Sequence, residues 1–242
     1  MSGSARALVH VVAGAVIDAA GHVLIAQRPE GKHLAGGWEF PGGKLEPGEE
    51  RAAGLARELR EELGITISTP RPLIRVRHAY PSRDVLLDMW VVKRYAGEPA
   101  GLDGQALRWC AQEDLPAAKL LPADEPIVAA LRLPERLMQA VTPFYSVGDL
   151  SSLREQPAAD PARRVRLRGV FCAGAEEAAA AAQAGADFLV LRSELAAGEL
   201  RALCGRASMP VYARGIPLEQ GWVLGASGLN EIGATSESGR GC

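Results

Sequence analysis

The 242-residue sequence has few cysteines, almost no net charge and no long apolar run. Its four cysteines, at positions 110, 172, 204 and 242, are scattered and form no Cys-x-x-Cys pair, which argues against a disulfide framework or a zinc site. The formal net charge is −2, so the protein lacks the excess of basic residues that binds nucleic-acid polymers independently of their base sequence. The N-terminus has no signal-peptide core, and no segment approaches membrane-spanning length. These absences predict a cytoplasmic protein with neither a membrane nor a nucleic-acid polymer as partner.

The segment from Gly43 to Ile65 organises the rest of the chain. Apolar residues recur in it at three- and four-residue steps, which predicts a helix from about Glu49 to Leu63 that ends at Gly64. The residues of this apolar stripe are Ala52, Leu55, Leu59 and Leu63.

Three glutamates project together from another face of the predicted helix, because Glu58, Glu61 and Glu62 stand at i, i+3 and i+4. Gly54 lies one turn earlier on the same side and is expected to leave room for something to approach. Crowded carboxylates repel one another unless a cation shares the site, and oxygen ligands suit Mg²⁺ or Mn²⁺. The bland alternative is a solvated helix face, which is what most runs of Glu and Arg form.

The N-terminal half predicts a mixed β-sheet that carries two helices. After a loose tail at residues 1–7, two Val- and Ile-rich runs flank a short turn and predict a β-hairpin over Leu8–Ile17 and His22–Gln27. Further strands are expected at Leu73–Tyr80, Val85–Tyr95 and Leu107–Cys110, and a second helix at Asp124–Leu131.

The C-terminal half changes character. Residues 135–164 are rich in Pro, Ser and Arg and are predicted to be a linker that contains one strand near Phe144. From 165 to 234, strand and helix patterns alternate, which predicts parallel strands. The predicted strands are Val165–Phe171, Phe188–Leu191 and Pro210–Ala213, and the predicted helices are Ala175–Ala184 and Leu195–Cys204. Residues 235–242 are expected to form a disordered tail.

Every fixed position of the Nudix box, GX5EX7REUXEEXGU with U aliphatic, is filled between Gly43 and Ile65. With the flanking segments Trp38–Lys44 and Leu121–Ile127, the chain from Val9 to Pro134 resembles Nudix hydrolases of the MutT type. Those enzymes are pyrophosphohydrolases that remove 8-oxo-dGTP from the nucleotide pool and so prevent replication errors. The resemblance implies an α+β Nudix fold, in which helices sandwich a mixed sheet, and a nucleoside triphosphate as small-molecule substrate.

The resemblance also implies a set of metal ligands. In the family the box glutamates and a backbone carbonyl of the glycine turn bind the metal, which is Mg²⁺ with Mn²⁺ as the alternative. Here the box glutamates are Glu58, Glu61 and Glu62, and the carbonyl is that of Gly42. Asp103 falls where the family places a further acidic ligand, although the family residue is the longer Glu.

The resemblance assigns catalytic roles as well. Arg57 is expected to pair with a box carboxylate, Glu49 or a neighbour, and so to aim the metal ligands. A metal-bound water attacks the β-phosphorus, and a carboxylate takes its proton. Glu58 is the first choice of base, while Asp103 and Glu61 remain alternatives.

Five residues match family positions that contact the substrate: Arg28, His33, Phe40, Arg83 and Asp124. The last is a departure, because MutT enzymes often have Asn there. An amide can donate to O6 of 8-oxoguanine and accept from N7–H, whereas an ionised carboxylate only accepts. Asp124 could match both groups only if burial raised its pKa. A broader substrate range is the alternative.

The C-terminal half resembles part of a thiamine-phosphate synthase/TenI-like barrel, on Gly169–Cys172, Ala184–Phe188, Met209–Ala213 and Gly225–Leu229. A complete (β/α)₈ barrel needs about 200 residues, which the chain does not have after its Nudix-like half. The loop after Leu191 also lacks a phosphate-binding Thr/Lys set. We therefore expect a smaller, partial barrel-like domain of four or five strands without synthase activity, docked on the Nudix domain or on a second copy of the chain.

Four functions remain open from the sequence. The leading hypothesis is a Mg²⁺-dependent 8-oxo-dGTP diphosphatase. The alternatives are a Nudix hydrolase for other nucleoside diphosphate derivatives, a bifunctional enzyme with thiamine-phosphate synthase activity, and a nucleotide-binding module without catalysis. The last typically loses box glutamates, which this sequence keeps.

Overall fold

The computed structural model describes residues 7–31, 34–137, 144–145 and 167–231. His33, most of the expected linker and both expected tails lie outside these ranges. The chain forms two compact units, Met1–Val128 and Ala129–Cys242, and the boundary between them falls inside helix α2 (Glu125–Arg132).

The first unit is built around a four-stranded mixed sheet with the strand order β4-β1-β7-β6. Strand β1 (Leu8–Val16) pairs in parallel with β7 (Asp84–Val92) and antiparallel with β4 (Gly42–Lys44), and β7 pairs antiparallel with β6 (Arg71–Ala79). Strand β7 lies inside the sheet, between β1 and β6, which explains why its last six residues are all buried. The mixed sheet expected from the sequence is therefore present.

The predicted hairpin between the first two strands is wrong. Strand β2 (Val23–Gln27) belongs to a separate sheet, between β3 (Trp38–Glu39) and β9 (Leu107–Cys110). Only one antiparallel bridge, Ile17 to Val23, joins the first two strands. Both edges of β1 are already paired with β4 and β7, so no edge is left for β2. A short pair, β5 (Thr66–Ile67) with β8 (Tyr95–Ala96), and two 3₁₀ turns, η1 (Leu115–Ala117) and η2 (Pro122–Asp124), complete this unit.

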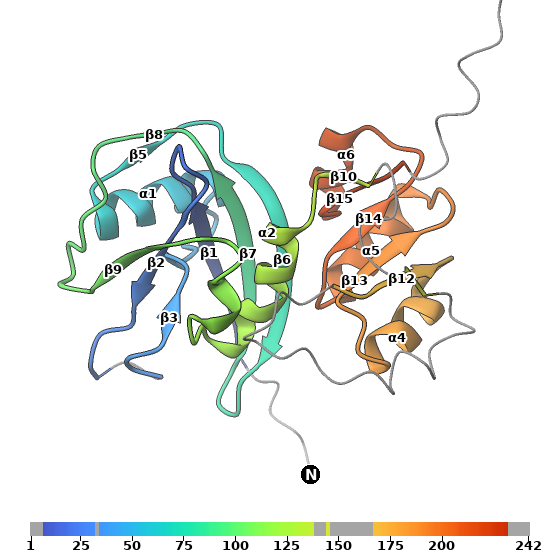
Figure 1. The fold of residues 1–242 in the computed structure, drawn as a ribbon, viewed down its shortest axis with the longest axis horizontal. Helices are drawn as coiled ribbons and strands as arrows, with labels where there is room; N and C mark the ends of the chain where they lie inside the picture. The colour runs from blue at the N-terminus through green and yellow to red at the C-terminus, as the bar shows by residue number, and fades with distance from the viewer. Residues whose placement is uncertain (1–6, 32–33, 138–143, 146–166, 232–242) are drawn as a thin grey trace, which may run out of the picture. The chain divides into compact units, whose positions relative to one another are not determined.

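Helix α1 (Arg51–Leu63) lies against β1 and β4 (Figure 1). The Glu50 side chain caps its first turn by accepting from Ala53 N at 3.0 Å, and Gly64 ends it in the left-handed conformation, φ 70°. The predicted apolar stripe is confirmed, because Leu55, Leu59 and Leu63 are fully buried. Gly14 has no side chain, which lets α1 pack closely against β1, since an added Cβ there would lie 3.0 Å from Leu59 Cδ1.

The second unit contains a parallel sheet with the strand order β10-β15-β14-β13-β12-β11. The strands are β10 (Arg136–Leu137), β11 (Phe144–Tyr145), β12 (Gly169–Cys172), β13 (Phe188–Leu191), β14 (Val211–Ala213) and β15 (Gly228–Asn230). The parallel arrangement was predicted, but the number of strands was not: the described residues of this unit form six strands, where four or five were expected. The first strand is β10 rather than the segment at Phe144, and it pairs with β15, the last.

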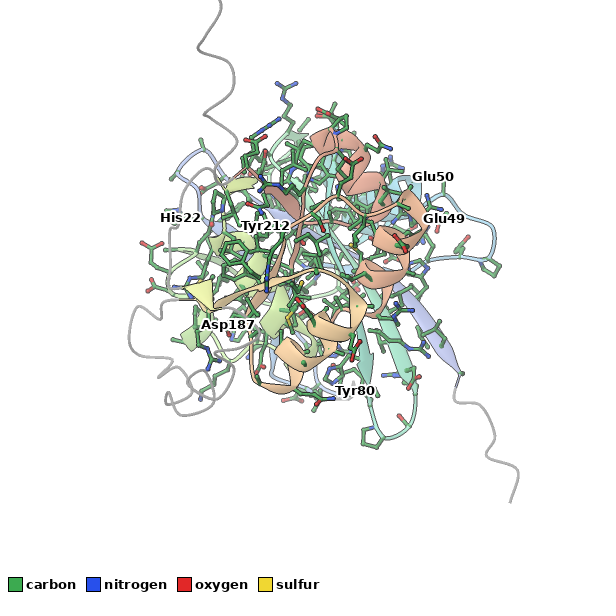
Figure 2. The ribbon with its side chains drawn as sticks, turned by 90° about the vertical axis from the view of Figure 1, so that its right-hand side faces the viewer. His22, Glu49, Glu50, Tyr80, Asp187 and Tyr212 are labelled. Atoms are coloured by element: carbon green, nitrogen blue, oxygen red, sulfur yellow. The ribbon has the colours of Figure 1, made fainter. Side chains whose placement is uncertain are left out.

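Both faces of this second sheet are covered. On one face, helices α4 (Ala175–Gln183), α5 (Ala197–Arg206) and α6 (Leu218–Leu224) share an apolar core with the strands. On the other, Phe188 and Tyr212 pack with Leu133 and Leu137, and the Tyr212 hydroxyl donates to the Pro134 carbonyl (Figure 2). No helix in the described part of the chain is long and apolar enough to cross a membrane.

Candidate active site

Two glycines bring the glutamates of α1 against strand β4. A Cβ added at Gly43 would collide with the Glu58 carboxylate, so only glycine lets Glu58 lie against the turn. Gly42, with φ 148°, donates its N–H to Glu62 Oε2 at 3.1 Å. The pattern that begins at Gly43 therefore fixes two carboxylates to the backbone of the turn that precedes the helix.

Arg57 holds three carboxylates at once. Its Nε and Nη2 donate to the two oxygens of Glu49, both at 2.9 Å, and its Nη1 donates to Glu58 at 2.9 Å and Glu61 at 3.2 Å. A further bond reaches the Lys44 carbonyl. The Arg57 hydrogen bonds lower the pKa of Glu49 to about 2. The pairing of Arg57 with Glu49 and its neighbours is thus the one that the sequence led us to expect.

Gly54 leaves room for neighbouring groups, as expected. An added Cβ at Gly54 would lie 2.6 Å from Leu45 Cδ1 and 2.8 Å from Glu49 Oε2. The groups that approach are therefore the side chains of Glu49 and Leu45, and the space allows the bond between Glu49 and Arg57.

Several carboxylates share the space around Glu62. Burial, followed by the carboxylates of Glu58, Glu39 and Asp103, raises the pKa of Glu62 to about 7, whereas the hydrogen bond from Gly42 N–H acts to lower this pKa. A small cavity of about 20 Å³ is lined by Glu62, Asp103, Glu39 and Gly42. Mutual repulsion of this kind is relieved when a cation enters.

This donor set fits a divalent cation. The carboxylate oxygens of Glu58, Glu62 and Asp103 and the Gly42 carbonyl are the hard ligands that Mg²⁺ and Mn²⁺ prefer. No three acidic, His or Cys side chains among the described residues converge tightly enough to hold an ion as they stand. Glu58 and Glu61 instead point to Arg57, and the Glu61 side chain is 60% exposed. Glu61 is thus a predicted ligand that the structure leaves largely in solvent.

A cleft of about 630 Å³ opens beside these carboxylates, with Glu58 and Glu62 in its wall. Alternate residues of β1 line it (Val9, Val11 and Ala13), whereas Val12 faces α1 on the other side of the sheet. Four of the five predicted substrate contacts lie in the same wall: Arg28, Phe40, Arg83 and Asp124. The fifth, His33, lies outside the described residues.

Two buried polar atoms in this wall have no hydrogen-bond partner among the described residues, Asp124 Oδ2 and Arg28 Nε. Asp124 is only 3% exposed, and this burial raises the pKa of its carboxyl well above the usual range. Glu39 adds to the shift and Arg28 opposes it. Burial therefore favours the protonated form of this carboxyl, which has one O–H donor and one C=O acceptor.

Sequence reasoning missed three residues of the cleft: Glu39, Tyr80 and Lys44. Glu39 accepts from Arg28 Nη1 at 2.6 Å and so orients that guanidinium. Tyr80 stands at the end of the β6–β7 hairpin (Figure 2), where burial raises the pKa of its phenol and the Asp124 carboxyl adds to the rise. Glu39 and Lys44 lie inside Trp38–Lys44, a segment that forms part of the family resemblance. Their membership of that segment could have identified them as candidate site residues. Tyr80 had no such signal.

Comparison with known proteins agrees with this site. A family model described as a NUDIX domain matches residues 12–130. The chain is 35% identical over 122 residues to the 8-oxo-dGTP diphosphatase of Escherichia coli (strain K12), a match that covers 50% of this chain and 95% of the relative. It is 40% identical over 123 residues to the CTP pyrophosphohydrolase of the same strain, over 51% of this chain and 90% of the relative.

A solved structure from work on MutT of Aliivibrio salmonicida and Vibrio cholerae is 34% identical and covers 51% of this chain and 96% of its own, with a TM-score of 0.45. The curated relatives carry the assignment, because the N-terminal half spans nearly their whole length. On that match, and on a complete box folded into a carboxylate-lined cleft, the chain belongs to the Nudix hydrolase family and is a hydrolase of diphosphate bonds.

Proposed function

We propose that this chain is a Mg²⁺-dependent nucleoside triphosphate pyrophosphohydrolase whose principal substrate is 8-oxo-dGTP. One observation carries the choice of nucleobase: the buried carboxyl of Asp124 lines the cleft, and its Oδ2 has no hydrogen-bond partner among the described residues. The E. coli relative named 8-oxo-dGTP diphosphatase supports it.

A neutral carboxyl recognises a donor that stands beside an acceptor. 8-Oxoguanine presents such a pair, N7–H and O6, so Asp124 can accept from the first and donate to the second. Guanine presents acceptors at both N7 and O6. One oxygen of Asp124 would then face an acceptor without a proton between them, at a cost of about 1–3 kcal/mol or roughly 10–100-fold in affinity.

The carboxylates and basic residues divide the remaining work. Glu58 takes a proton from the attacking water as the water oxygen bonds to the β-phosphorus. The bond from that phosphorus to the oxygen bridging it to the α-phosphorus breaks, and nucleoside monophosphate and pyrophosphate leave. Lys44, Arg28 and Arg83 line the cleft and attract the phosphates. Glu58, Glu62, Asp103 and Gly42, with Glu61 nearby, would hold the cation. When bound, a divalent cation neutralises phosphate oxygens and lowers the pKa of water.

Cytidine triphosphate is a second candidate substrate, because the same carboxyl fits cytosine. The N4 amino group of cytosine is a donor, and its neighbour N3 is an acceptor, so this base also offers an adjacent pair. The relative named CTP pyrophosphohydrolase is 40% identical over the Nudix-like half. The carboxyl of Asp124 thus fits both 8-oxoguanine and cytosine, and it disfavours unoxidised guanine that presents its N7/O6 edge.

For residues 165–234 we propose a reduced barrel-like domain of the thiamine-phosphate synthase type, without synthase activity, which follows the Nudix domain (8–134) and a linker (135–164). Two short strands from the linker range, β10 and β11, join the sheet of this domain. The pairing of β10, the first strand of that sheet, with β15, the last, supports the proposal, because ring closure requires that adjacency. Near the N-termini of α4 and α5, backbone N–H groups that could bind a phosphate are bonded to glutamates: Glu177 accepts from Ala173 N at 2.8 Å and Glu199 from Ala196 N at 3.3 Å. Thiamine-phosphate synthase activity of the full chain would contradict this proposal.

Pyrophosphate release in the presence of Mg²⁺ tests the substrate assignment. The substrates to compare are 8-oxo-dGTP, dGTP, CTP and ADP-ribose. We expect kcat/KM to be highest for 8-oxo-dGTP, next for CTP, and at least about tenfold lower for dGTP. A preference for ADP-ribose would replace this function by that of another Nudix hydrolase, and no turnover of any nucleotide would leave a binding module.

Arg57→Lys is expected to lower kcat by about 10–100-fold, because an ammonium cannot bond both oxygens of Glu49 and also reach Glu58. The matched control is Arg60→Lys on the exposed face of the same helix, for which no change is expected. Equal kcat values for the two variants would show that Arg57 does not orient the carboxylates.

A further inference from the structure

The loop between β8 and β9 is fastened to the end of α1. The last carbonyls of a helix have no partner within it. Here Leu102 N donates to the Glu62 carbonyl at 3.0 Å, and Ala100 N donates to the Leu63 carbonyl at 3.1 Å. The loop therefore caps the same turn of α1 that carries the Glu62 carboxylate.

The Gln105 side chain adds a second connection between the same two segments. Its Oε1 accepts from Asp103 N at 2.9 Å, and its Nε2 donates to the Glu62 carbonyl at 3.2 Å. Gly101 leaves the space that this loop needs, because an added Cβ there would collide with the Gln105 carbonyl. The Gln105 amide can do this because it offers an acceptor to one neighbour and a donor to the other.

Asp103 and Glu62 meet in one place as a result. Both line the cavity of about 20 Å³, and Gln105 forms part of its wall. Aspartate has a short side chain with two rotatable bonds, so the position of its carboxylate follows the position of its backbone closely. The bond to Asp103 N thus acts directly on where that carboxylate lies.

We propose that Gln105 is a positioning residue, which holds the Asp103 carboxylate beside that of Glu62 so that the two can share a divalent cation. This inference rests on the proposed metal site, and it assigns to Gln105 a role that does not require contact with the substrate or the cation.

The test is the affinity of the full-length protein for Mn²⁺ in the absence of nucleotide, measured by electron paramagnetic resonance of the free ion. We expect Gln105→Ala to raise the dissociation constant about 10-fold or more. The matched control is Gln112→Ala, because Gln112 Nε2 also makes a single bond to a backbone carbonyl in this unit, that of Gly21, at 3.2 Å. It should leave Mn²⁺ binding unchanged while costing similar thermal stability.

Two further variants keep the outcome decisive. Gln105→Asn preserves the amide but is too short to span both partners, so it should weaken Mn²⁺ binding even if Gln105→Ala does not fold. Wild-type affinity in Gln105→Asn or Gln105→Ala would overturn the inference. If Glu62→Gln also binds Mn²⁺ like the wild type, the metal site itself fails; if Glu62→Gln weakens binding and the Gln105 variants do not, only the role of Gln105 fails.

Discussion

Glu58→Gln is expected to lower kcat by a factor of about 10² to 10⁴, the usual contribution of a general base. The Glu58 side chain is only 13% exposed, packs against Gly43 and accepts from Arg57 Nη1 at 2.9 Å. Glutamine preserves this shape but cannot take a proton from water. Pyrophosphate release at saturating 8-oxo-dGTP and Mg²⁺ measures the effect.

The control for this variant is Glu50→Gln, at the start of the same helix, where the side chain caps Ala53 N rather than facing the cleft (Figure 2 labels Glu50). We expect it to change kcat by less than about twofold. A larger loss in Asp103→Asn or Glu61→Gln than in Glu58→Gln would transfer the role of base to that residue.

Asp124→Leu is expected to lower kcat/KM for 8-oxo-dGTP about 100-fold, since it removes both hydrogen bonds to the oxidised base, each worth about 1–1.5 kcal/mol. Turnover of dGTP should change much less, because guanine forms at most one of those bonds. The two specificity constants, measured in one preparation, give the change in selectivity directly.

Asp124→Asn is the matched control, because an amide keeps one donor and one acceptor. It should retain the preference for 8-oxo-dGTP over dGTP. If Asp124→Leu and the wild type discriminate equally well, another group reads the base, and the neutral carboxyl has no part in selectivity.

Asp124→Asn is also expected to raise Tm at pH 7. Burial raises the pKa of Asp124 in the folded protein well above its unfolded value of about 3.9, so the folded state binds the proton more tightly. The stability from this group is complete below the unfolded pKa and is lost as pH rises towards the folded pKa. The gain in Tm should therefore vanish near pH 4 and grow with pH. An equal gain in Tm at pH 4 and at pH 7 would show that the raised pKa of Asp124 is not the cause.

The helix and its carboxylates were predictable because their signals are local. Apolar spacing, the box glutamates and Gly64 each act within a few residues, and all appear in α1 where expected. Pairing between distant segments carries no such signal. Nothing in Leu8–Ile17 indicates that β7, more than seventy positions on, occupies the edge that β2 was expected to take.

The burial of Asp124 was likewise beyond a local pattern. The sequence showed an acid where an amide was expected, but the burial that raises the pKa of this acid comes from the packing of η2 within the unit. Very short strands such as β10 and β15 offer too few residues for alternation to show, which is why the sheet of the second unit was undercounted.

The adjacency of β10 and β15 has a consequence for synthesis. Arg136, in the first strand β10, pairs with Glu231, 95 positions later, so this sheet cannot be completed until almost the entire unit has left the ribosome. The strands described for the Nudix half, β1 to β9, pair only with one another, so that half can fold while the rest is still being translated. Until β15 arrives, one side of β14 is an unpaired strand edge that can join another nascent chain. The second half of the molecule is therefore where aggregation during expression is expected to begin.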